Sequence, residues 1–243
     1  TQPPPPAPTT RWYSSAASDV YKRQALCYAR YGATVILLGR TGSKLEAVYD
    51  EIEASGGPKP ALVELDLATA NEENCINLAS GLAGEFEHLD GLLHNAGVLG
   101  ERRPIESAGY SAWQEVMQVN VNAQFLLTRH LLPLLKAAPS ASIIFTSSGV
   151  GRTGRAYWGA YAVSKFATEG FCQVLASELE NTSKIRVNCL NPGATNTAMR
   201  RTAYPAEHPN TNPAPEDIMA SYLFLMGEDS LGVTGRSFDA QLT

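Results

Sequence analysis

The chain has 243 residues, of which 44% are hydrophobic and 18% charged, and its formal net charge is −5. This length and composition favour one soluble α/β domain with a substantial core, and the negative charge argues against a nucleic-acid partner. The sequence contains no apolar run of about 18 residues, so no membrane span is predicted. The four cysteines lack the spacing of a zinc site or a disulfide framework. We therefore expect a cytoplasmic protein without a membrane or metal partner.

The N-terminal segment differs from the rest of the chain. Residues 1–10 are rich in proline, and residues 11–18 show no clear strand or helix pattern. We predict that residues 1–18 form an atypical leader, either disordered or foreign to the domain, and that residues 19–243 form a single domain.

From about residue 20 onward, helical and extended patterns alternate. Strands are predicted over 34–38, 61–65, 89–93, 142–145, 185–190 and 236–240, and the apolar, β-branched run over 34–38 is typical of a strand buried on both faces. Helices are predicted over 25–29 (closing at Gly32), 43–54, 72–85, 111–136, 161–181 and 218–226. This alternation predicts a three-layer, doubly wound parallel sheet of the Rossmann-like kind, with ligands bound beyond the carboxyl ends of the strands.

A tyrosine and a lysine lie four residues apart on the predicted helix over 161–181. Tyr161 and Lys165 therefore share one helix face, and both side chains can reach one point. A free tyrosine has a pKa of about 10, but a neighbouring ammonium favours the phenolate, so the pair could exchange a proton at neutral pH. Taken alone, this spacing more often reflects a structural tyrosine beside a solvated lysine.

Two further polar residues strengthen the catalytic interpretation. Ser148 follows the strand predicted over 142–145, where its hydroxyl could polarise a substrate oxygen. Asn120 lies within a predicted helix, which asparagine disfavours, so a specific hydrogen bond is indicated, such as one that holds a relay water. Ser148 could instead be a turn residue and Asn120 an exposed helix residue, and Asn122 is an equally placed alternative.

Together, Asn120, Ser148, Tyr161 and Lys165 resemble the catalytic tetrad of the short-chain dehydrogenase/reductase family. Three other segments resemble that family in the same order, Leu65-Asp66-Leu67, His94-Asn95-Ala96-Gly97 and Asn191-Pro192-Gly193-Ala194-Thr195-Asn196-Thr197. Segments 28–40 and 188–193 are similar to the bacterial YciK-type oxidoreductases within it. The resemblance covers residues 20–243.

The resemblance implies an oxidoreductase that moves a hydride between a nicotinamide cofactor and a carbonyl or alcohol. Tyr161 would exchange the proton, and Ser148 would steady the substrate oxygen. Lys165 would tune Tyr161 and bind the nicotinamide ribose, while Asn120 would link Lys165 to solvent through a water. The implied reaction needs no metal, and the implied assembly is a homodimer or homotetramer.

The resemblance also assigns residues to the cofactor. Asp66 and Leu67 would lie at the adenine. The turn over the adenosine ribose would consist of Asn95, Ala96 and Gly97. The nicotinamide would be held by Pro192, Gly193, Thr195 and Thr197, together with Tyr161 and Lys165.

The end of the second predicted strand favours NADP over NAD. An NAD enzyme of this kind would place an acidic residue near Gly39 to bind the ribose 2′-hydroxyl, and none is present. Arg40 follows instead, and a guanidinium suits a 2′-phosphate. Lys44 is a second candidate phosphate partner, and a solvated loop arginine remains the alternative for Arg40.

The N-terminus departs from the family. Members carry a first strand followed by Thr-Gly-x-x-x-Gly-x-Gly, whose glycines let the backbone approach the pyrophosphate. Asp19 and Tyr21 stand where the last two glycines belong, and no apolar strand precedes them. Their side chains would collide with the phosphates, and two inner strand edges would lack a partner. We therefore expect the first strand to be missing or replaced.

Two function classes remain open. The leading one is an NADP-dependent oxidoreductase acting on a small carbonyl or alcohol compound. The alternative is a cofactor-deficient, non-catalytic Rossmann-like binding scaffold, because the glycine-rich loop is absent. An NAD-dependent epimerase or dehydratase of the extended branch is disfavoured by chain length. Residues 198–215 are a candidate lid over the substrate, and residues 100–109 a second wall.

Overall fold

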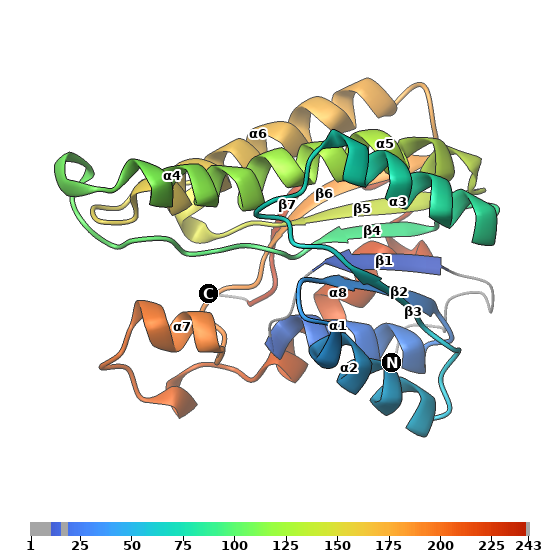
Figure 1. Ribbon diagram of the computed structural model, residues 1–243, viewed down its shortest axis with the longest axis horizontal. Helices are drawn as coiled ribbons and strands as arrows, with labels where there is room; N and C mark the ends of the chain where they lie inside the picture. Colours follow the sequence, from blue (N-terminus) through green and yellow to red (C-terminus); the bar gives the residue numbers. More distant parts are fainter. Residues whose placement is uncertain (1–10, 16–18, 242–243) are drawn as a thin grey trace.

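The computed structural model describes residues 11–15 and 19–241, which form one seven-stranded sheet covered by helices (Figure 1). The strand order is β3-β2-β1-β4-β5-β6-β7, and every pair is parallel. The strands are β1 (Arg11–Ser15), β2 (Thr34–Gly39), β3 (Ala61–Glu64), β4 (Gly91–His94), β5 (Ala141–Thr146), β6 (Ile185–Asn191) and β7 (Ser237–Asp239). The predicted doubly wound fold is confirmed.

Helices cover both faces of the sheet (Figure 1). One face carries α1 (Asp19–Arg30), α2 (Gly42–Ala54) and α8 (Met219–Met226), and the other carries α3 (Glu72–Glu85), α4 (Tyr110–Met117), α5 (Ala123–Ala137) and α6 (Gly159–Leu179). A short helix, α7 (Ala198–Ala203), lies apart from both layers, within the segment predicted as a lid. Every predicted helix and strand is present, although the predicted helix over 111–136 is interrupted by a π-helical turn, η2 (Gln118–Asn122).

A first strand is present, so the expectation that this strand is missing was wrong, while its replacement by another sequence stays a prediction. β1 has the sequence Arg-Trp-Tyr-Ser-Ser and lies between β2 and β4, pairing Trp12 with both Val35 and Gly91. Two of its five residues are aromatic and suit extended backbone. Pairing satisfies the backbone groups of β2 and β4, which would otherwise be buried without partners. Of the leader predicted over residues 1–18, only residues 11–15 are described, and they form β1. Residues 1–10 and 16–18 lie outside the described part of the chain.

The core follows the apolar runs of the sequence. The strands β4 and β5 are buried at every position, and β2 at every position after its first. Cys75, Cys172 and Cys189 are buried free thiols, as predicted for small apolar residues, while Cys27 is half-buried. Among the described residues, no helix combines the length and the apolar character that crossing a bilayer requires.

One buried cation joins the amino-terminal end of β6 to the helices beside it. The Arg186 guanidinium is almost fully buried and donates to Ser230 Oγ (3.1 Å), Ser140 Oγ (2.7 Å) and the carbonyls of Met226 (3.4 Å) and Gly227 (3.1 Å). Burial lowers the pKa of Arg186. Because its partners are hydroxyls and carbonyls, they would be left without a donor if the side chain were removed.

We predict that Arg186→Ala lowers the free energy of unfolding by about 3 kcal/mol, measured by urea denaturation. The matched control is Arg129→Ala, because Arg129 is exposed and pairs with Glu72 at 3.0 Å on the surface. That change should cost less than about 0.5 kcal/mol. Equal losses in the two variants would contradict this account of Arg186.

Candidate active site

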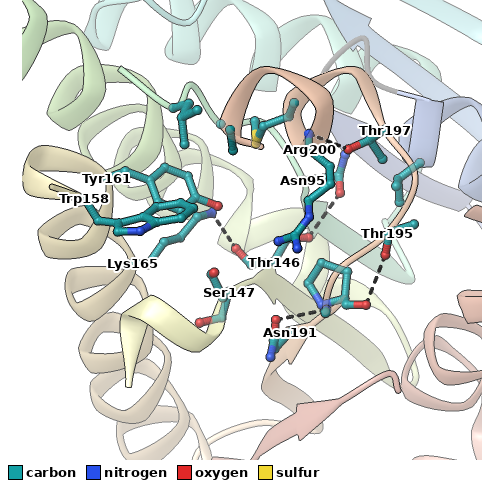
Figure 2. A pocket seen from close by; sticks show the side chains of 18 of the residues that line it. Asn95, Thr146, Ser147, Trp158, Tyr161, Lys165, Asn191, Thr195, Thr197 and Arg200 are labelled. Carbon is teal, nitrogen blue, oxygen red and sulfur yellow. Dashed lines mark hydrogen bonds between the residues drawn. The ribbon is translucent and has the colours of Figure 1, made fainter. Parts of the chain in front are cut away.

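A cavity of about 200 Å³ lies at the carboxyl ends of the central strands, where a doubly wound sheet binds its ligands (Figure 2). The loops after β4, β5 and β6 form its floor, α6 forms one wall, and the segment around α7 forms another. Its polar lining residues are Asn95, Thr146, Ser147, Ser148, Lys165, Asn191, Thr195, Thr197 and Arg200. Tyr161 also lines it, so the fold brings Ser148, Tyr161 and Lys165 to one cavity.

Three of the four predicted catalytic side chains meet there directly. Ser148 follows β5, and its hydroxyl lies near enough to Tyr161 on α6 to lower the pKa of the phenol. Lys165, one turn later on α6, lies with Nζ 5.6 Å from the centre of the Tyr161 ring. Its ammonium donates to the carbonyl of Thr146 at 2.7 Å (Figure 2). The phenol, the serine hydroxyl and the ammonium thus form one polar cluster within a buried wall.

The pKa values of this cluster differ from the sequence-based expectation. Burial raises the pKa of Tyr161 to about 12, and the hydrogen bond from Ser148 offsets only part of that rise. Burial also lowers the pKa of Lys165 to about 8, against the opposing charge of Glu169. Tyr161 is therefore a protonated phenol at neutral pH, while Lys165 is still charged. Desolvation outweighs the ammonium that was expected to acidify Tyr161.

Close packing fixes the serine loop against α6. The loop continues from Ser148 into a short 3₁₀ turn, η3 (Gly149–Gly151). A Cβ atom on Gly151 would lie 2.8 Å from Lys165 Cβ and 2.9 Å from the Lys165 carbonyl carbon, so only glycine fits. The missing side chain at Gly151 lets the loop that holds Ser148 rest directly on the helix turn that holds Lys165.

Asn120 is buried in the π-helical turn η2, whereas the alternative, Asn122, is exposed and donates a hydrogen bond to Gln118. The Asn120 amide clamps the loop after β4, accepting from Val98 N (2.8 Å) and donating to Val98 O (3.0 Å) and Ser164 Oγ (3.0 Å). A Cβ on Gly97 would lie 3.4 Å from Asn120 Oδ1 and 3.7 Å from Lys165 Nζ. Asn120 thus lies near Lys165, and its amide bonds to Val98 and Ser164. The relay through water remains a prediction.

The turn after β4 is fixed by internal hydrogen bonds. Asn95 Oδ1 accepts from Thr146 Oγ1 (3.2 Å) and Gln24 Nε2 (3.3 Å), which joins β4, β5 and α1. His94, which stands where the family has asparagine, is buried, stacked on Phe145 (4.8 Å between ring centres) and bonded to Thr128 (2.8 Å). Burial lowers the pKa of His94 to about 3, so it is neutral and structural.

The loop after β6 carries the predicted nicotinamide residues Pro192, Gly193, Thr195 and Thr197, and all four line the cavity. Thr197 caps α7 by accepting from the backbone N–H of Arg200 at 3.1 Å, which leaves its hydroxyl proton free to donate. Gln241 braces the loop, donating to the carbonyls of Pro192 (2.8 Å) and Ala194 (3.0 Å). Gly193 has a φ of +73°, and a Cβ there would lie 2.8 Å from Gln241 Cδ.

A second cavity, of about 150 Å³, lies beside the first at the ends of β2 and β3, and Gly97 lines both. Arg40, Lys44, Asp66, Leu67 and Ala96 line it, as the sequence predicted for the adenosine end of a dinucleotide. Asp66 Oδ1 accepts from Ala68 N at 3.0 Å, which fixes the turn. Arg40 is exposed, and neither Arg40 nor Lys44 forms an ion pair with a described residue.

The expected collision at the start of α1 is only partly testable. Tyr21 is buried in the core with Tyr28 and Tyr222 and lines neither cavity, which contradicts the prediction that its side chain meets the phosphates. Val20 lines the cavity instead. Residues 16–18 and the side chain of Asp19 lie outside the described part of the chain.

Aromatic and basic side chains close the cavity over the reacting cluster. Trp158, Tyr204, Leu99, Met199 and Ala203 form the apolar wall. Arg102, from the predicted second wall, stacks between Trp158 (4.6 Å) and Tyr204 (5.0 Å) and donates to the carbonyl of Ala203. Arg200 is held by both carboxylate oxygens of Glu207, at 2.6 and 2.7 Å.

Several of these residues were missed from the sequence. Glu169 lies four residues after Lys165, so Tyr161, Lys165 and Glu169 share one helix stripe, and this spacing was an available signal. Trp158 and Gln241 carry no comparable signal, since their roles depend on contacts with distant segments. Among the described residues, no three His, Cys, Asp or Glu side chains gather as a metal would require.

Comparison with known proteins places this site in a family. The sequence model described as short chain dehydrogenase matches residues 20–208. The oxidoreductase YciK of Escherichia coli K12 is 53% identical over 228 residues, covering 94% of this chain and 90% of that protein. A Shigella flexneri short chain dehydrogenase complexed with NADP has a TM-score of 0.93 at 51% identity, covering 96% of this chain and 97% of the other.

A short chain dehydrogenase from E. coli CFT073, complexed with NADPH, also has a TM-score of 0.93 at 51% identity, with the same coverage of 96% and 97%. The matches to YciK and to the two solved structures extend over nearly the whole chain. The chain therefore belongs to the short-chain dehydrogenase family of oxidoreductases.

Proposed function

We propose that this protein is an NADP-dependent oxidoreductase that interconverts a small carbonyl compound and its alcohol. The observation that carries the proposal is that Ser148, Tyr161 and Lys165 line one cavity, with Lys165 Nζ 5.6 Å from the centre of the Tyr161 ring. The solved relatives from Shigella and E. coli hold NADP and NADPH, respectively. Their similarity to this chain supports the same cofactor here.

The two cavities fit such a cofactor. Arg40 and Lys44 offer cations without ion-pair partners among the described residues, as a 2′-phosphate requires. Gly97 joins the two cavities at a point where a side chain would crowd Asn120 and Lys165. Asp66, Leu67 and the turn from Asn95 to Gly97 would hold the adenosine half, while Pro192, Gly193, Thr195 and Thr197 would hold the nicotinamide half.

Bound there, the cofactor would supply or accept the hydride. Tyr161, protonated at neutral pH, would donate its phenolic proton to the oxygen of the carbonyl compound during reduction. Ser148 would hold the same oxygen by a hydrogen bond as its negative charge develops. The Lys165 ammonium would stabilise the resulting phenolate. Asn120 would position the backbone of Val98 beside Lys165, and the apolar wall of Trp158 and Tyr204 would exclude water.

We also propose that copies of the chain assemble through the outer face of α5 and α6. Phe125, Val163, Phe166 and Val174 each expose between 43% and 57% of their surface. The three residues on α6 fall on one helix stripe, as an oligomer interface requires. The stoichiometry, homodimer or homotetramer, and the cytoplasmic location stay predictions.

Replacing Tyr161 tests the proposed proton transfer. Tyr161→Phe removes the proton that is transferred, so kcat for NADPH-dependent reduction of a panel of ketones and aldehydes should fall by about 10²- to 10⁴-fold. NADPH affinity, measured by nicotinamide fluorescence, should change by less than about threefold, since the ring remains. Unchanged turnover would remove Tyr161 from the mechanism. A chain that binds no NADPH at all would instead favour the non-catalytic scaffold.

The rate of reduction should depend on pH through Lys165. The Lys165 ammonium is present below its pKa of about 8 and is lost as the pH rises through that value. The kcat/KM for reduction should therefore be level at pH 6–7 and fall above about pH 8, where the phenolate loses its counter-charge. In Lys165→Arg the guanidinium stays charged, so any remaining activity should not fall there. A fall at the same pH in both proteins would assign it to another group.

Replacing Arg40 tests the preference for NADP over NAD. Arg40→Ala should weaken NADPH binding by about 10- to 100-fold, because a charge-assisted hydrogen bond to the 2′-phosphate is lost. NADH, which lacks that phosphate, should bind within about twofold of its original affinity. Arg129→Ala, which changes an exposed arginine far from both cavities, is the control. An equal loss of affinity for NADPH and NADH would show that Arg40 does not bind the 2′-phosphate.

A further inference from the structure

A single arginine beside the active site joins three separate parts of the chain. Arg152 directly follows η3, four residues after Ser148. Its guanidinium donates five hydrogen bonds, to Glu169 Oε1 (3.2 Å), Asp239 Oδ1 (2.9 Å), Asp239 Oδ2 (2.8 Å), Ser237 Oγ (2.7 Å) and the Phe238 carbonyl (2.9 Å). All three nitrogens of the guanidinium thus donate hydrogen bonds.

On one side this network reaches the catalytic serine. Glu169 is buried on α6, and its Oε1 accepts from Ser147 Oγ at 2.5 Å and from Ser237 Oγ at 2.9 Å. The Ser147 N–H also donates to the Leu190 carbonyl at 2.8 Å. Ser147 is therefore held by both its side chain and its backbone, and the peptide that carries Ser148 is fixed with it.

On the other side the network reaches the proposed nicotinamide loop. Asp239 Oδ1 accepts from Asn191 Nδ2 at 2.7 Å, and Asn191 Oδ1 accepts from the Gly193 N–H at 3.0 Å. An unbroken series of hydrogen bonds thus runs from Ser147 through Glu169, Arg152, Asp239 and Asn191 to Gly193. It joins the loop that would hold the substrate oxygen to the loop that would hold the nicotinamide.

We propose that Arg152 is a positioning residue that fixes the Ser148 loop and the Gly193 loop relative to each other through β7. An isolated ion pair at the surface contributes little, and Arg152 and Asp239 are partly exposed. Both carboxylate oxygens of Asp239 accept from Arg152 Nη1, however, and the same guanidinium donates through Nε to the buried Glu169, so the pair can transmit position even where it adds little stability. The proposal rests on the proposed function for its meaning, since alignment of the two loops matters for hydride and proton transfer.

The test compares Asp239→Ala and Arg152→Lys with Arg186→Lys. Arg186 also donates several hydrogen bonds, but it lies at the opposite end of β6, away from the cavity. Amide hydrogen exchange, read by mass spectrometry, should be about tenfold faster over 147–151 and over 191–195 in both network variants. For Asp239→Ala the change over 147–151 is decisive, because Asp239 bonds to Arg152 and Asn191 and not to that loop. Arg186→Lys should leave both segments within about twofold of the parent.

Activity provides a second readout. For a ketone that the parent reduces, kcat should fall by about 10- to 100-fold in the network variants, while KM changes by less than about threefold, because loops misplaced by about 1 Å still bind but align poorly. The proposal is overturned if Asp239→Ala leaves exchange over 147–151 unchanged, or if Arg186→Lys speeds both loops equally. Hydrogen exchange decides the coupling even if no ketone is reduced, so a failure of the proposed function remains distinguishable.

Discussion

The site depends on one buried charge and the carbonyl that receives it. Lys165 is almost fully enclosed, and its ammonium reaches the Thr146 carbonyl at the last residue of β5. Burying an ammonium is costly unless its protons find acceptors, so this contact fixes the position of α6 relative to β5. That position in turn determines where Tyr161 lies on α6, where Gly151 packs against Lys165, and where Ser148 lies beside them. The same enclosure brings the lysine's titration close to the physiological range.

Much of the fold was predictable because its signals are local. The apolar runs of β2, β5 and β6 and the helices between them were identified, and so was the doubly wound order of the sheet. β1 was not, because Arg-Trp-Tyr-Ser-Ser becomes a strand through the open backbone edges of β2 and β4, which sequence pattern does not reveal. The π-helical turn at Asn120 was also missed, since one extra residue in a helical turn barely alters an apolar periodicity.

The site shows the same division between local and distant signals. Ser148, Tyr161 and Lys165 were found from their spacing, and they meet in one cavity. Arg152 and Asp239 lie 87 residues apart and share no motif, so only the folded sheet brings them together. The ionisation of Tyr161 was misjudged for a related reason. Sequence shows that a lysine is near, but the extent to which both groups lose water is set by Trp158, the α7 segment and η3.

The bracing of the loop over 192–195 by Gln241 has a consequence for how sequence changes reach the cavity. Gln241 contributes an amide that holds the carbonyls of Pro192 and Ala194, although Gln241 itself does not line the cavity. A substitution at Gln241 would therefore release these two carbonyls and alter one wall of the cavity, while every residue that lines it stays unchanged.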